Sequence, residues 1–343
     1  MFLTADRSVP PAPAASASAA SPLSTSAILR YLAEALTADP LALPVLGLKG
    51  CIKGGAALRA GLENVAPGPV RRLAGCYVLY ACVQLDTLVD ELPGFEQAVL
   101  VHRFVEACIT RARPLSALVR EVGGCRALTP RERLRTVLLL RNLHWLVRST
   151  EARLESPERL AFFREKLSGL IAAVVEDMNL EARARDTLST LAPEYPAMGL
   201  SGLEVLWLLQ GRPLEEIRSF RPVFSLAEQL GRLEDDILEV WKALRSGGDA
   251  DAVEGRVDRR NLVLRHTRNL HWSLRAAMEE ACGLSGRLQA RLEEALGALG
   301  AHPLAPELRR VVTFFPSFVD ILMGPHRVPP PAATAPESLA RSA

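Results

Sequence analysis

The sequence has little that would indicate a nucleic-acid-binding or membrane-spanning protein. The formal net charge of the 343-residue chain is only +2, and it contains no concentrated basic stripe, finger motif or aromatic RNA-binding motif. No apolar run reaches the roughly 20 residues that a membrane-spanning helix needs. The nearest run, residues 73–85, is interrupted by Gly75 and Gln84. We therefore expect neither a nucleic-acid partner nor a transmembrane segment.

Signals for zinc or disulfide chemistry are also scarce. The chain has six cysteines without a CxxC pair, and its histidines occur singly without an HExxH motif. The cysteines fall mostly inside apolar helical patterns, so we interpret them as reduced core residues of a cytoplasmic protein. Oxygen ligands are then the candidates for any metal site.

Alternating β-branched segments are scarce as well, and Leu, Ala, Arg and Glu dominate most of the chain. This composition predicts an all-α protein, a single helical bundle over residues 27–327. Residues 1–26 are rich in Pro, Ala and Ser without a continuous hydrophobic segment, and residues 328–343 begin with VPPPAATAP. We expect both to be disordered tails, the first not a signal peptide. The sequence does not fix the oligomeric state, and a homodimer is left open.

One acidic helix is expected from Val70 to Leu92, where Pro93-Gly94 ends it. Apolar residues at spacings of three and four lead up to Asp86, so Asp86 and then Asp90 extend an inward-facing stripe. Glu91 lies beside them in sequence. Carboxylates at the end of a buried helix predict a metal-binding rim.

A second acidic helix is expected from Leu226 to Leu244. It carries Asp235, Asp236 and Glu239 among apolar residues, and the four-residue spacing places Asp235 and Glu239 on one face. A carboxylate on a buried surface is costly unless a cation compensates it. The alternative is the solvated face of an amphipathic helix.

Two further stretches have two interpretations each. Thr190–Gly202 contains two prolines and two glycines, so it breaks the helical pattern. The break is either an ordinary turn or the start of a helix whose free backbone N–H groups attract an anion. Gly47–Leu62 is Gly-rich and contains Lys49 and Lys53. We expect a flexible, solvated connection there, the alternative being that its lysines meet an anion.

If the two acidic helices face each other across a bundle core, five carboxylates surround one cavity. They belong to Asp86, Asp90, Asp235, Asp236 and Glu239. Oxygen-only ligation favours Mg²⁺ over zinc or di-iron. Because Mg²⁺ uses a few carboxylates together with substrate phosphates, the expected partner is a phosphorylated small molecule in an apolar pocket.

The ordered pair DTLVDE (Asp86–Glu91) and DDILEVWK (Asp235–Lys242) resembles the two metal motifs of the class I isoprenoid synthase superfamily. In the first, Thr87 replaces the second aspartate. NLVLRH (Asn261–His266) is similar to the segment after the second motif in terpene synthases. TLAPEYPAMGLSG is similar to their diphosphate-sensing broken helix, although the arginine expected after Tyr195 is missing.

The resemblance implies a class I isoprenoid synthase bundle and, as the leading function, a terpene synthase (cyclase). Such a lyase ionises an allylic isoprenoid diphosphate with Mg²⁺ and releases pyrophosphate. The implied catalytic residues are Asp86, Asp90 and Asp236. The implied metal ligands are Asp86, Asp90, Glu91, Asp235, Asp236 and Glu239. The implied diphosphate-binding residues are Arg232, Lys242 and Tyr195.

Two alternatives stay open. The first is a prenyltransferase of the same superfamily, either chain-elongating or squalene/phytoene synthase-like. GGAALR (Gly54–Arg59) resembles a GGKRLR-type isopentenyl diphosphate site but lacks the central Lys-Arg pair, which disfavours chain elongation. The second is a catalytically degenerate helical binding protein, suggested by Thr87 and the missing arginine. The aromatic residues either line a substrate cavity or fill the core: Tyr77, Tyr80, Trp207, Phe224, Phe314 and Phe315.

Overall fold

The computed structural model describes residues 25–62, 68–176, 202–245, 253, 257, 261–270 and 272–312. Within these ranges the regular secondary structure is helical and no strand occurs, so the all-α prediction is confirmed. The first helix begins at Thr25, so it includes the last two residues of the predicted N-terminal tail. Several predicted features lie outside the described residues: the rest of that tail, the C-terminal tail, the break at 190–201, and Tyr195, Phe314 and Phe315.

The structure describes fifteen helical elements in chain order. They are α1 (Thr25–Ala38), α2 (Ala42–Leu62), α3 (Pro69–Tyr77), the π-helix η1 (Val78–Gln84), α4 (Leu85–Asp90), α5 (Phe95–Ile109), α6 (Leu115–Gly124), α7 (Pro130–Glu151), α8 (Pro157–Glu176), α10 (Gly202–Leu209), α11 (Leu214–Ser219), α12 (Arg221–Arg245), α14 (Leu262–Leu270), α15 (Leu274–Ala298) and α16 (Ala305–Val312).

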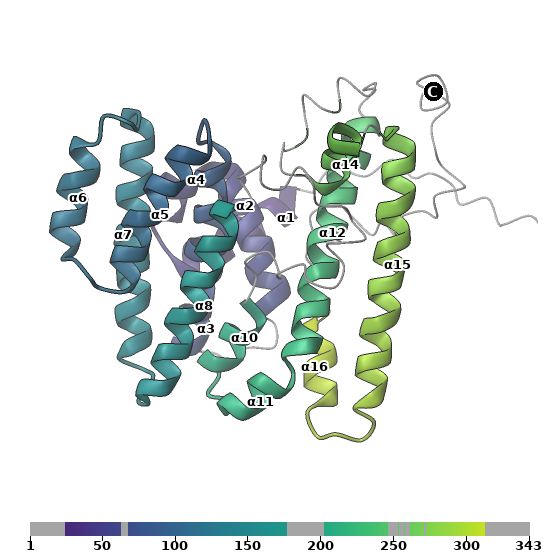
Figure 1. Ribbon diagram of the computed structural model, residues 1–343. Coiled ribbons are helices and arrows are strands. Elements are labelled where there is room, and N and C mark those ends of the chain that lie inside the picture. Colours follow the sequence, from purple (N-terminus) through teal and green to yellow (C-terminus); the bar gives the residue numbers. More distant parts are fainter. Residues whose placement is uncertain are drawn as a thin grey trace, which may run out of the picture.

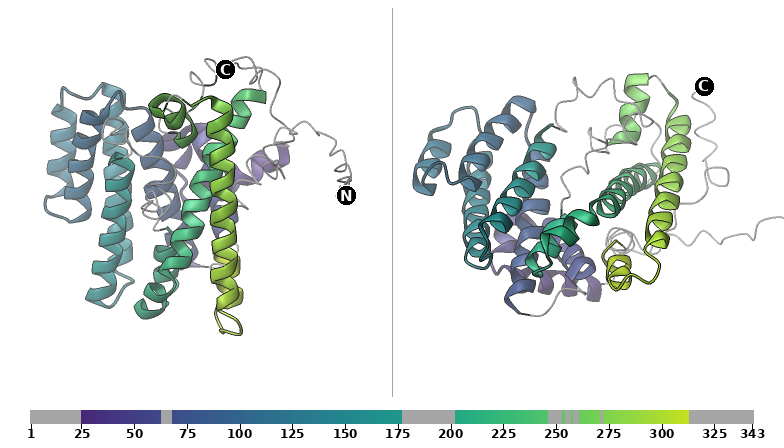
Figure 2. Two further views of the ribbon diagram at one scale, coloured as in Figure 1. Left: turned by 45° about the vertical axis from the view of Figure 1, so that its right-hand side comes forward. Right: turned by 60° about the horizontal axis from the view of Figure 1, so that its bottom comes forward.

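The helices form two outer groups with a third group between them. In Figure 1, α5, α6 and α7 lie at one side, and α12, α14, α15 and α16 lie at the other. The N-terminal helices and α8 lie between these groups, and the views in Figure 2 show the long helices running side by side. Helix α12 packs against α15, α14 and α16, whereas α2 packs against α1 and η1. The first acidic segment and the second therefore come from different layers of the bundle.

Helix α2 corrects one prediction. The stretch 47–62 was expected to be a flexible connection, but it is helical, with a kink at Gly47. A Cβ atom on Gly55 would lie 1.9 Å from the carbonyl oxygen of Tyr31, and one on Gly54 would lie 2.5 Å from a methyl carbon of Leu79. The glycines thus let α2 approach α1 and η1 very closely, and this packing outweighs their low helix propensity.

The predicted helix 70–92 is present as one continuous run through α3, η1 and α4, from Pro69 to Asp90. Its middle seven residues, Val78–Gln84, are π-helical, with backbone hydrogen bonds that reach one residue further than in an α-helix. The residues before and after η1 therefore do not keep one 3.6-residue register. The simple spacing argument that placed Asp86 does not account for this shift.

The core is built largely from leucines together with a few large aromatic side chains. Tyr77, Trp207 and Phe224 are almost completely inaccessible to solvent. Trp207 contacts Phe224 edge-to-face, with ring centroids 5.1 Å apart. Edge-to-face aromatic pairs add to the free energy gained by burying the rings. These rings fix α10 against α12 in the interior.

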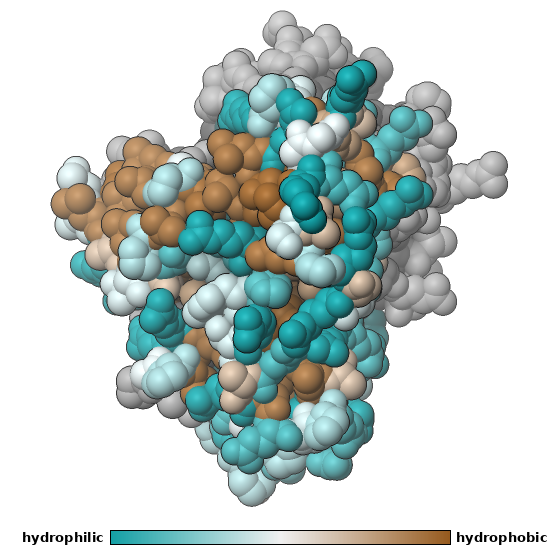
Figure 3. All heavy atoms as spheres, turned by 90° about the vertical axis from the view of Figure 1, so that its left-hand side faces the viewer, coloured by the Kyte–Doolittle hydropathy of each residue, from teal (hydrophilic) through white to brown (hydrophobic). Residues whose placement is uncertain are grey.

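The surface is mostly polar but carries exposed apolar side chains. Figure 3 shows a continuous apolar area among polar residues on one face. Among the described residues, the exposed large apolar side chains are Leu29, Leu41, Leu43, Leu48, Leu134, Trp145 and Trp272. None of the helices within the described ranges has the length and apolarity needed to cross a membrane.

Candidate active site

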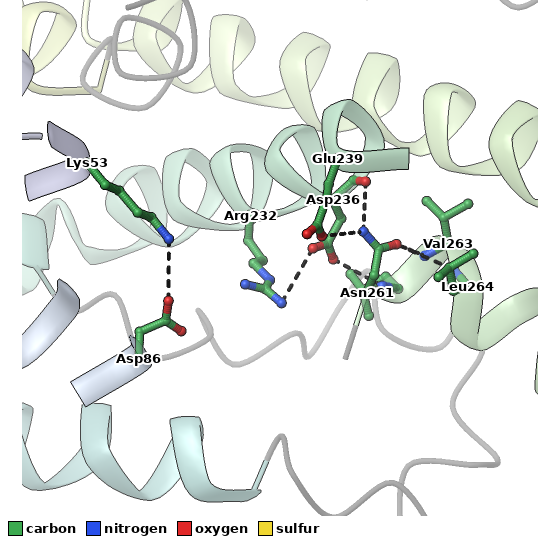
Figure 4. Close-up of polar contacts among 9 residues, drawn as sticks. Lys53, Asp86, Arg232, Asp236, Glu239, Asn261, Val263 and Leu264 are labelled. Carbon is green, nitrogen blue, oxygen red and sulfur yellow. Dashed lines mark hydrogen bonds and ion pairs between the residues drawn. The ribbon is translucent and has the colours of Figure 1, made fainter. Parts of the chain in front are cut away.

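The three acidic residues of α12 differ sharply in their surroundings. Asp235 is exposed, Asp236 is 2% exposed and Glu239 is intermediate. The carboxylate of Asp236 accepts a hydrogen bond from the backbone N–H of Leu262 at 3.1 Å and forms an ion pair with Arg232 at 3.4 Å (Figure 4). Asp236 therefore joins the start of α14 to α12. It is an internal structural contact as well as a member of the predicted site.

Asn261 completes this junction. Its side-chain N–H group donates to the backbone carbonyl of Asp236 at 2.8 Å and to the Glu239 carboxylate at 3.2 Å (Figure 4). Its side-chain oxygen accepts from the backbone N–H groups of Val263 and Leu264. Asparagine is a favoured N-cap residue because it satisfies otherwise unpaired N–H groups of the first turn. Asn261 thus caps α14 and orients Glu239 at the same time.

Asp86 lies in the first turn of α4, and its partner comes from α2. The ammonium group of Lys53 lies 3.4 Å from the Asp86 carboxylate, and the two side chains are 40% and 25% exposed (Figure 4). The pKa of Lys53 is raised, first by the charge of Asp86 and further by Asp235, against the opposing effects of burial and Arg232. Lys53 is therefore charged at neutral pH. It also lies within electrostatic reach of both acidic segments.

The residues that follow Asp86 in the first acidic segment contact a different helix where the structure describes them. Glu91 forms ion pairs with Arg131, at 3.3 Å, and with Arg135, so it is held by α7. Thr87 is partly buried, and the Asp90 side chain lies outside the described residues. The contacts therefore connect Asp86 to α2, whereas they connect Glu91 to α7.

The predicted diphosphate-binding residues are also unequal. The Arg232 side chain is 17% exposed and pairs with Asp236 one turn away. Lys242 is exposed on the outer part of α12. In Figure 4 the Lys53 side chain extends to Asp86, whereas the Arg232 side chain extends from α12 and pairs with Asp236. Arg232 is thus the better placed of the two to act inside the bundle.

A second charged group lies deeper in the bundle, two turns before Asp235 on α12. Glu228 is 3% exposed and accepts a hydrogen bond from the backbone N–H of Leu203 at the start of α10. Burial is the main cause that raises its pKa well above the usual value, although backbone hydrogen bonds oppose the shift. Nearby, buried Lys166 pairs with buried Glu204 at 2.6 Å. Glu228 thus joins the start of α10 to α12 in the interior of the bundle.

The chemistry of the donors fits Mg²⁺ in kind. Asp86, Asp235 and Glu239 offer only oxygen atoms, which a hard divalent cation prefers. Within the described residues, however, no group of three or more His, Cys, Asp or Glu side chains is close enough to hold a metal ion. Asp86 and Asp236 are paired with Lys53 and Arg232 instead. These two cations provide part of the positive charge that a metal ion would bring.

Sequence reasoning gave an incomplete account of three residues of this region. Lys53 was placed in a flexible connection, with contact to an anion as the alternative, and Glu228 belongs to no motif. Asn261 was noted only as the first residue of a similar segment. The available signals were the glycines that follow Lys53 and the helix-face spacing of Glu228 and Arg232. Neither signal reveals which helix lies opposite, so the contacts emerge only from the tertiary structure.

The arrangement of helices is the class I isoprenoid synthase fold, in which an all-α bundle carries acidic segments on two helices. Solved structures that it is similar to include three of 2-methylisoborneol synthase from Streptomyces coelicolor A3(2). One of them has a TM-score of 0.59 at 14% identity and covers 86% of this chain and 89% of that one. A complex with Mg²⁺ and geranyl-S-thiolodiphosphate has a TM-score of 0.57 at 15% identity, covering 87% and 92%.

A third structure, a complex of the same synthase with Mg²⁺ and 2-fluoroneryl diphosphate, gives a TM-score of 0.56 at 13% identity and covers 87% of this chain and 89% of that one. No protein-family model matches the sequence, and no curated protein matches it significantly. At such low identity the likeness shows the fold, and the predicted class I bundle is confirmed. Residue roles have to be argued from the site itself.

Proposed function

We propose that the protein is a class I terpene synthase that ionises an allylic isoprenoid diphosphate and releases pyrophosphate. The observation that carries this proposal is the ion pair between Lys53 of α2 and Asp86 of α4, whose atoms lie 3.4 Å apart. The charge of Asp235 on α12 adds to that of Asp86 in raising the pKa of Lys53, so acidic residues from two helices far apart in sequence act on one position. The matched synthase binds Mg²⁺ and a geranyl thiolodiphosphate, which supports the same chemistry for this fold.

In this proposal Asp86, Asp90, Asp235 and Glu239 hold Mg²⁺ through carboxylate oxygens. When bound, Mg²⁺ neutralises the charge that develops on the departing diphosphate. Arg232 binds a diphosphate oxygen from the interior side, with Lys242 further out and Tyr195 on the preceding segment. Asp236 is best assigned to holding α14 in place, because its carboxylate is buried and bonded to the Leu262 N–H. Glu91 is best assigned to the contact with α7.

The bundle interior then controls the fate of the cation. The buried rings of Tyr77, Trp207 and Phe224 lie in the apolar core next to α12. Aromatic faces stabilise cations, and an apolar interior excludes the water that would quench them. Cyclisation or loss of a proton inside this interior completes a lyase reaction. The interior would also set the accepted chain length.

The prenyltransferase alternative is less well supported. Its main sequence sign was GGAALR, the resemblance to an isopentenyl diphosphate site. Gly54 and Gly55 have a packing role, since a Cβ atom at either position would collide with η1 or α1. The glycines are thereby explained without a second substrate.

The test is turnover with geranyl, farnesyl and geranylgeranyl diphosphates and Mg²⁺, each with and without isopentenyl diphosphate. Pyrophosphate release and extractable hydrocarbons are measured. We expect a hydrocarbon from one diphosphate alone, and a loss of at least about 100-fold in kcat for Asp86→Ala and Glu239→Gln, as for removal of a group that stabilises transition-state charge.

Arg275→Gln serves as the matched control, because Arg275 lies on α15 in an exposed ion pair with Glu279. It should turn over at the wild-type rate. Product formation only with isopentenyl diphosphate would move the protein to the prenyltransferases. A folded wild type that releases no pyrophosphate from any of the three diphosphates would contradict the enzyme proposal and favour the binding protein.

A further inference from the structure

The ion pair between Lys53 and Asp86 has the geometry of a contact that can open, not of a tight structural ion pair. Its ammonium group lies 3.4 Å from Asp86, which is long for a charge-assisted hydrogen bond. Its side chain is 40% exposed, so a ligand can reach it. The lysine stem is flexible, and its three donors rotate freely. The pair can therefore open without loss of a buried interaction.

The base of Lys53, in contrast, is held rigidly. Gly54 packs against Leu79 and Val83 of η1, and Gly55 packs against the backbone of Tyr31. Val83 lies only three residues before Asp86, so the same contact that fixes α2 on η1 brings Lys53 to Asp86. Because the backbone of Lys53 is fixed and its side chain is flexible, the ammonium group can move a short distance away from Asp86 while α2 stays in place.

The charges around Lys53 indicate where its ammonium group can move. Lys53 lies within electrostatic reach of Asp235 and Arg232 of α12, in addition to its contact with Asp86. Figure 4 shows its ammonium group at Asp86 and the Arg232 guanidinium group beside Asp236. A divalent cation competes with Lys53 for the Asp86 oxygen atoms. A diphosphate attracts both Lys53 and Arg232.

We propose that Lys53 is a placeholder cation at Asp86 that transfers to the substrate diphosphate when Mg²⁺ takes its position. The inference rests on the proposed function and adds to it a diphosphate-binding residue from α2. It also supplies a positive charge in a protein whose sequence lacks the arginine expected after Tyr195. Asp86 keeps a positive partner before and after the exchange. The exchange needs no change in backbone structure.

The experiment measures two affinities in the absence of turnover. Mn²⁺ replaces Mg²⁺ because it takes the same oxygen ligands, and free Mn²⁺ is counted by electron paramagnetic resonance. Inorganic pyrophosphate is then titrated calorimetrically at saturating Mg²⁺. Both are measured for the wild type, Lys53→Met, Lys53→Gln and Lys53→Arg. Arg59→Met is the matched control, since Arg59 is on the same helix but faces Glu34 of α1.

We expect Lys53→Met and Lys53→Gln to bind Mn²⁺ alone about threefold more tightly, the size of a removed exposed ion pair. We expect them to bind pyrophosphate at least about tenfold more weakly, the size of a lost hydrogen bond to a charged group. Lys53→Arg should restore most of the pyrophosphate affinity, and Arg59→Met should change neither. Circular dichroism verifies that each variant is folded, and two neutral replacements of different shape are used because the Lys53 side chain is only partly exposed.

The outcomes separate the two proposals. If the wild type binds pyrophosphate with Mg²⁺ and the neutral variants bind both ligands equally well, the Lys53 inference is overturned and the proposed function stands. The same holds if Mn²⁺ affinity falls in the neutral variants, because Lys53 then supports the metal rather than competing with it. If the wild type itself binds no pyrophosphate with Mg²⁺, the proposed function fails first.

Discussion

The two acidic segments have similar sequences but opposite physical roles. Asp86 forms a long, partly exposed ion pair with a lysine from another helix. Asp236 is buried and receives a guanidinium group and a backbone N–H. Asn261 adds a hydrogen bond to the backbone carbonyl of Asp236. One carboxylate is therefore free to exchange partners, whereas the other belongs to the framework. Mutation of Asp86 consequently tests binding, whereas mutation of Asp236 tests folding.

The largest effect should come from Asp236→Ala, which would lower the free energy of unfolding by about 3–5 kcal/mol, because it removes one partner of a buried ion pair. Asp86→Ala should cost at most about 1 kcal/mol, as for an exposed pair. Urea unfolding followed by circular dichroism measures both. Asp235→Asn, at the exposed neighbouring position, is the control and should be neutral. Equal losses for Asp236→Ala and Asp86→Ala would remove the distinction between the two segments.

The second largest effect concerns the close packing of α1 against α2, the helix that brings Lys53 to Asp86. Gly55→Ala places a Cβ atom 1.9 Å from the Tyr31 carbonyl oxygen, so α1 and α2 must separate, at a cost of about 3 kcal/mol. Gly286→Ala on α15 is the matched control, since no atom lies within 4 Å of its new Cβ. It should stabilise the protein by about 0.5–1 kcal/mol through helix propensity. A thermal melt that shifts equally in both variants would contradict the close contact.

The smallest effect depends on pH and concerns Glu228. Burial raises its pKa in the folded protein, so the folded state holds a proton that the unfolded state releases above the usual value near 4.5. Its contribution to stability is fully present below that value and is lost as the pH rises toward the folded-state pKa. Glu228→Gln cannot lose a proton, so its stability relative to the wild type should increase between pH 4 and pH 8.

The measurement for Glu228→Gln is the free energy of unfolding in urea at intervals across that range. The amide oxygen of glutamine can still accept from the Leu203 N–H, which keeps the α10 contact. The exposed Glu279→Gln on α15 is the control and should show no such trend. A constant difference between Glu228→Gln and the wild type at all pH values would contradict the raised pKa.

Much of the architecture was predictable because helical periodicity is a local property. The helix through Asp86 and the helix through Asp236 lie close to their predicted limits. The face of a helix that carries Asp235 and Glu239 also follows from spacing. Which of three adjacent acids is buried does not, because it depends on the partner helix. In the structure the residue between them, Asp236, is the buried one.

The failure at α2 has a different cause. Glycine lowers helix propensity, so a local argument predicts a loop wherever glycines accumulate. Gly54 and Gly55 lie instead at contacts where any side chain would collide with Leu79 or Tyr31. The gain from this close packing is invisible to a single-sequence argument. The sequence named Lys53 as one of the lysines that could meet an anion, but it did not predict the contact of Lys53 with Asp86.

The direction in which the Asp86 side chain points depends on the number of residues in the π-helix η1. Each residue added to or removed from a helix rotates everything beyond it by about 100°, the angle that follows from 3.6 residues per turn. A π-helical turn contains more residues than an α-helical turn, because its hydrogen bonds reach one residue further. The direction of Asp86 therefore depends on the number of residues in Val78–Gln84. Insertion or deletion of one residue in this segment would turn the Asp86 carboxylate toward a different face of the bundle.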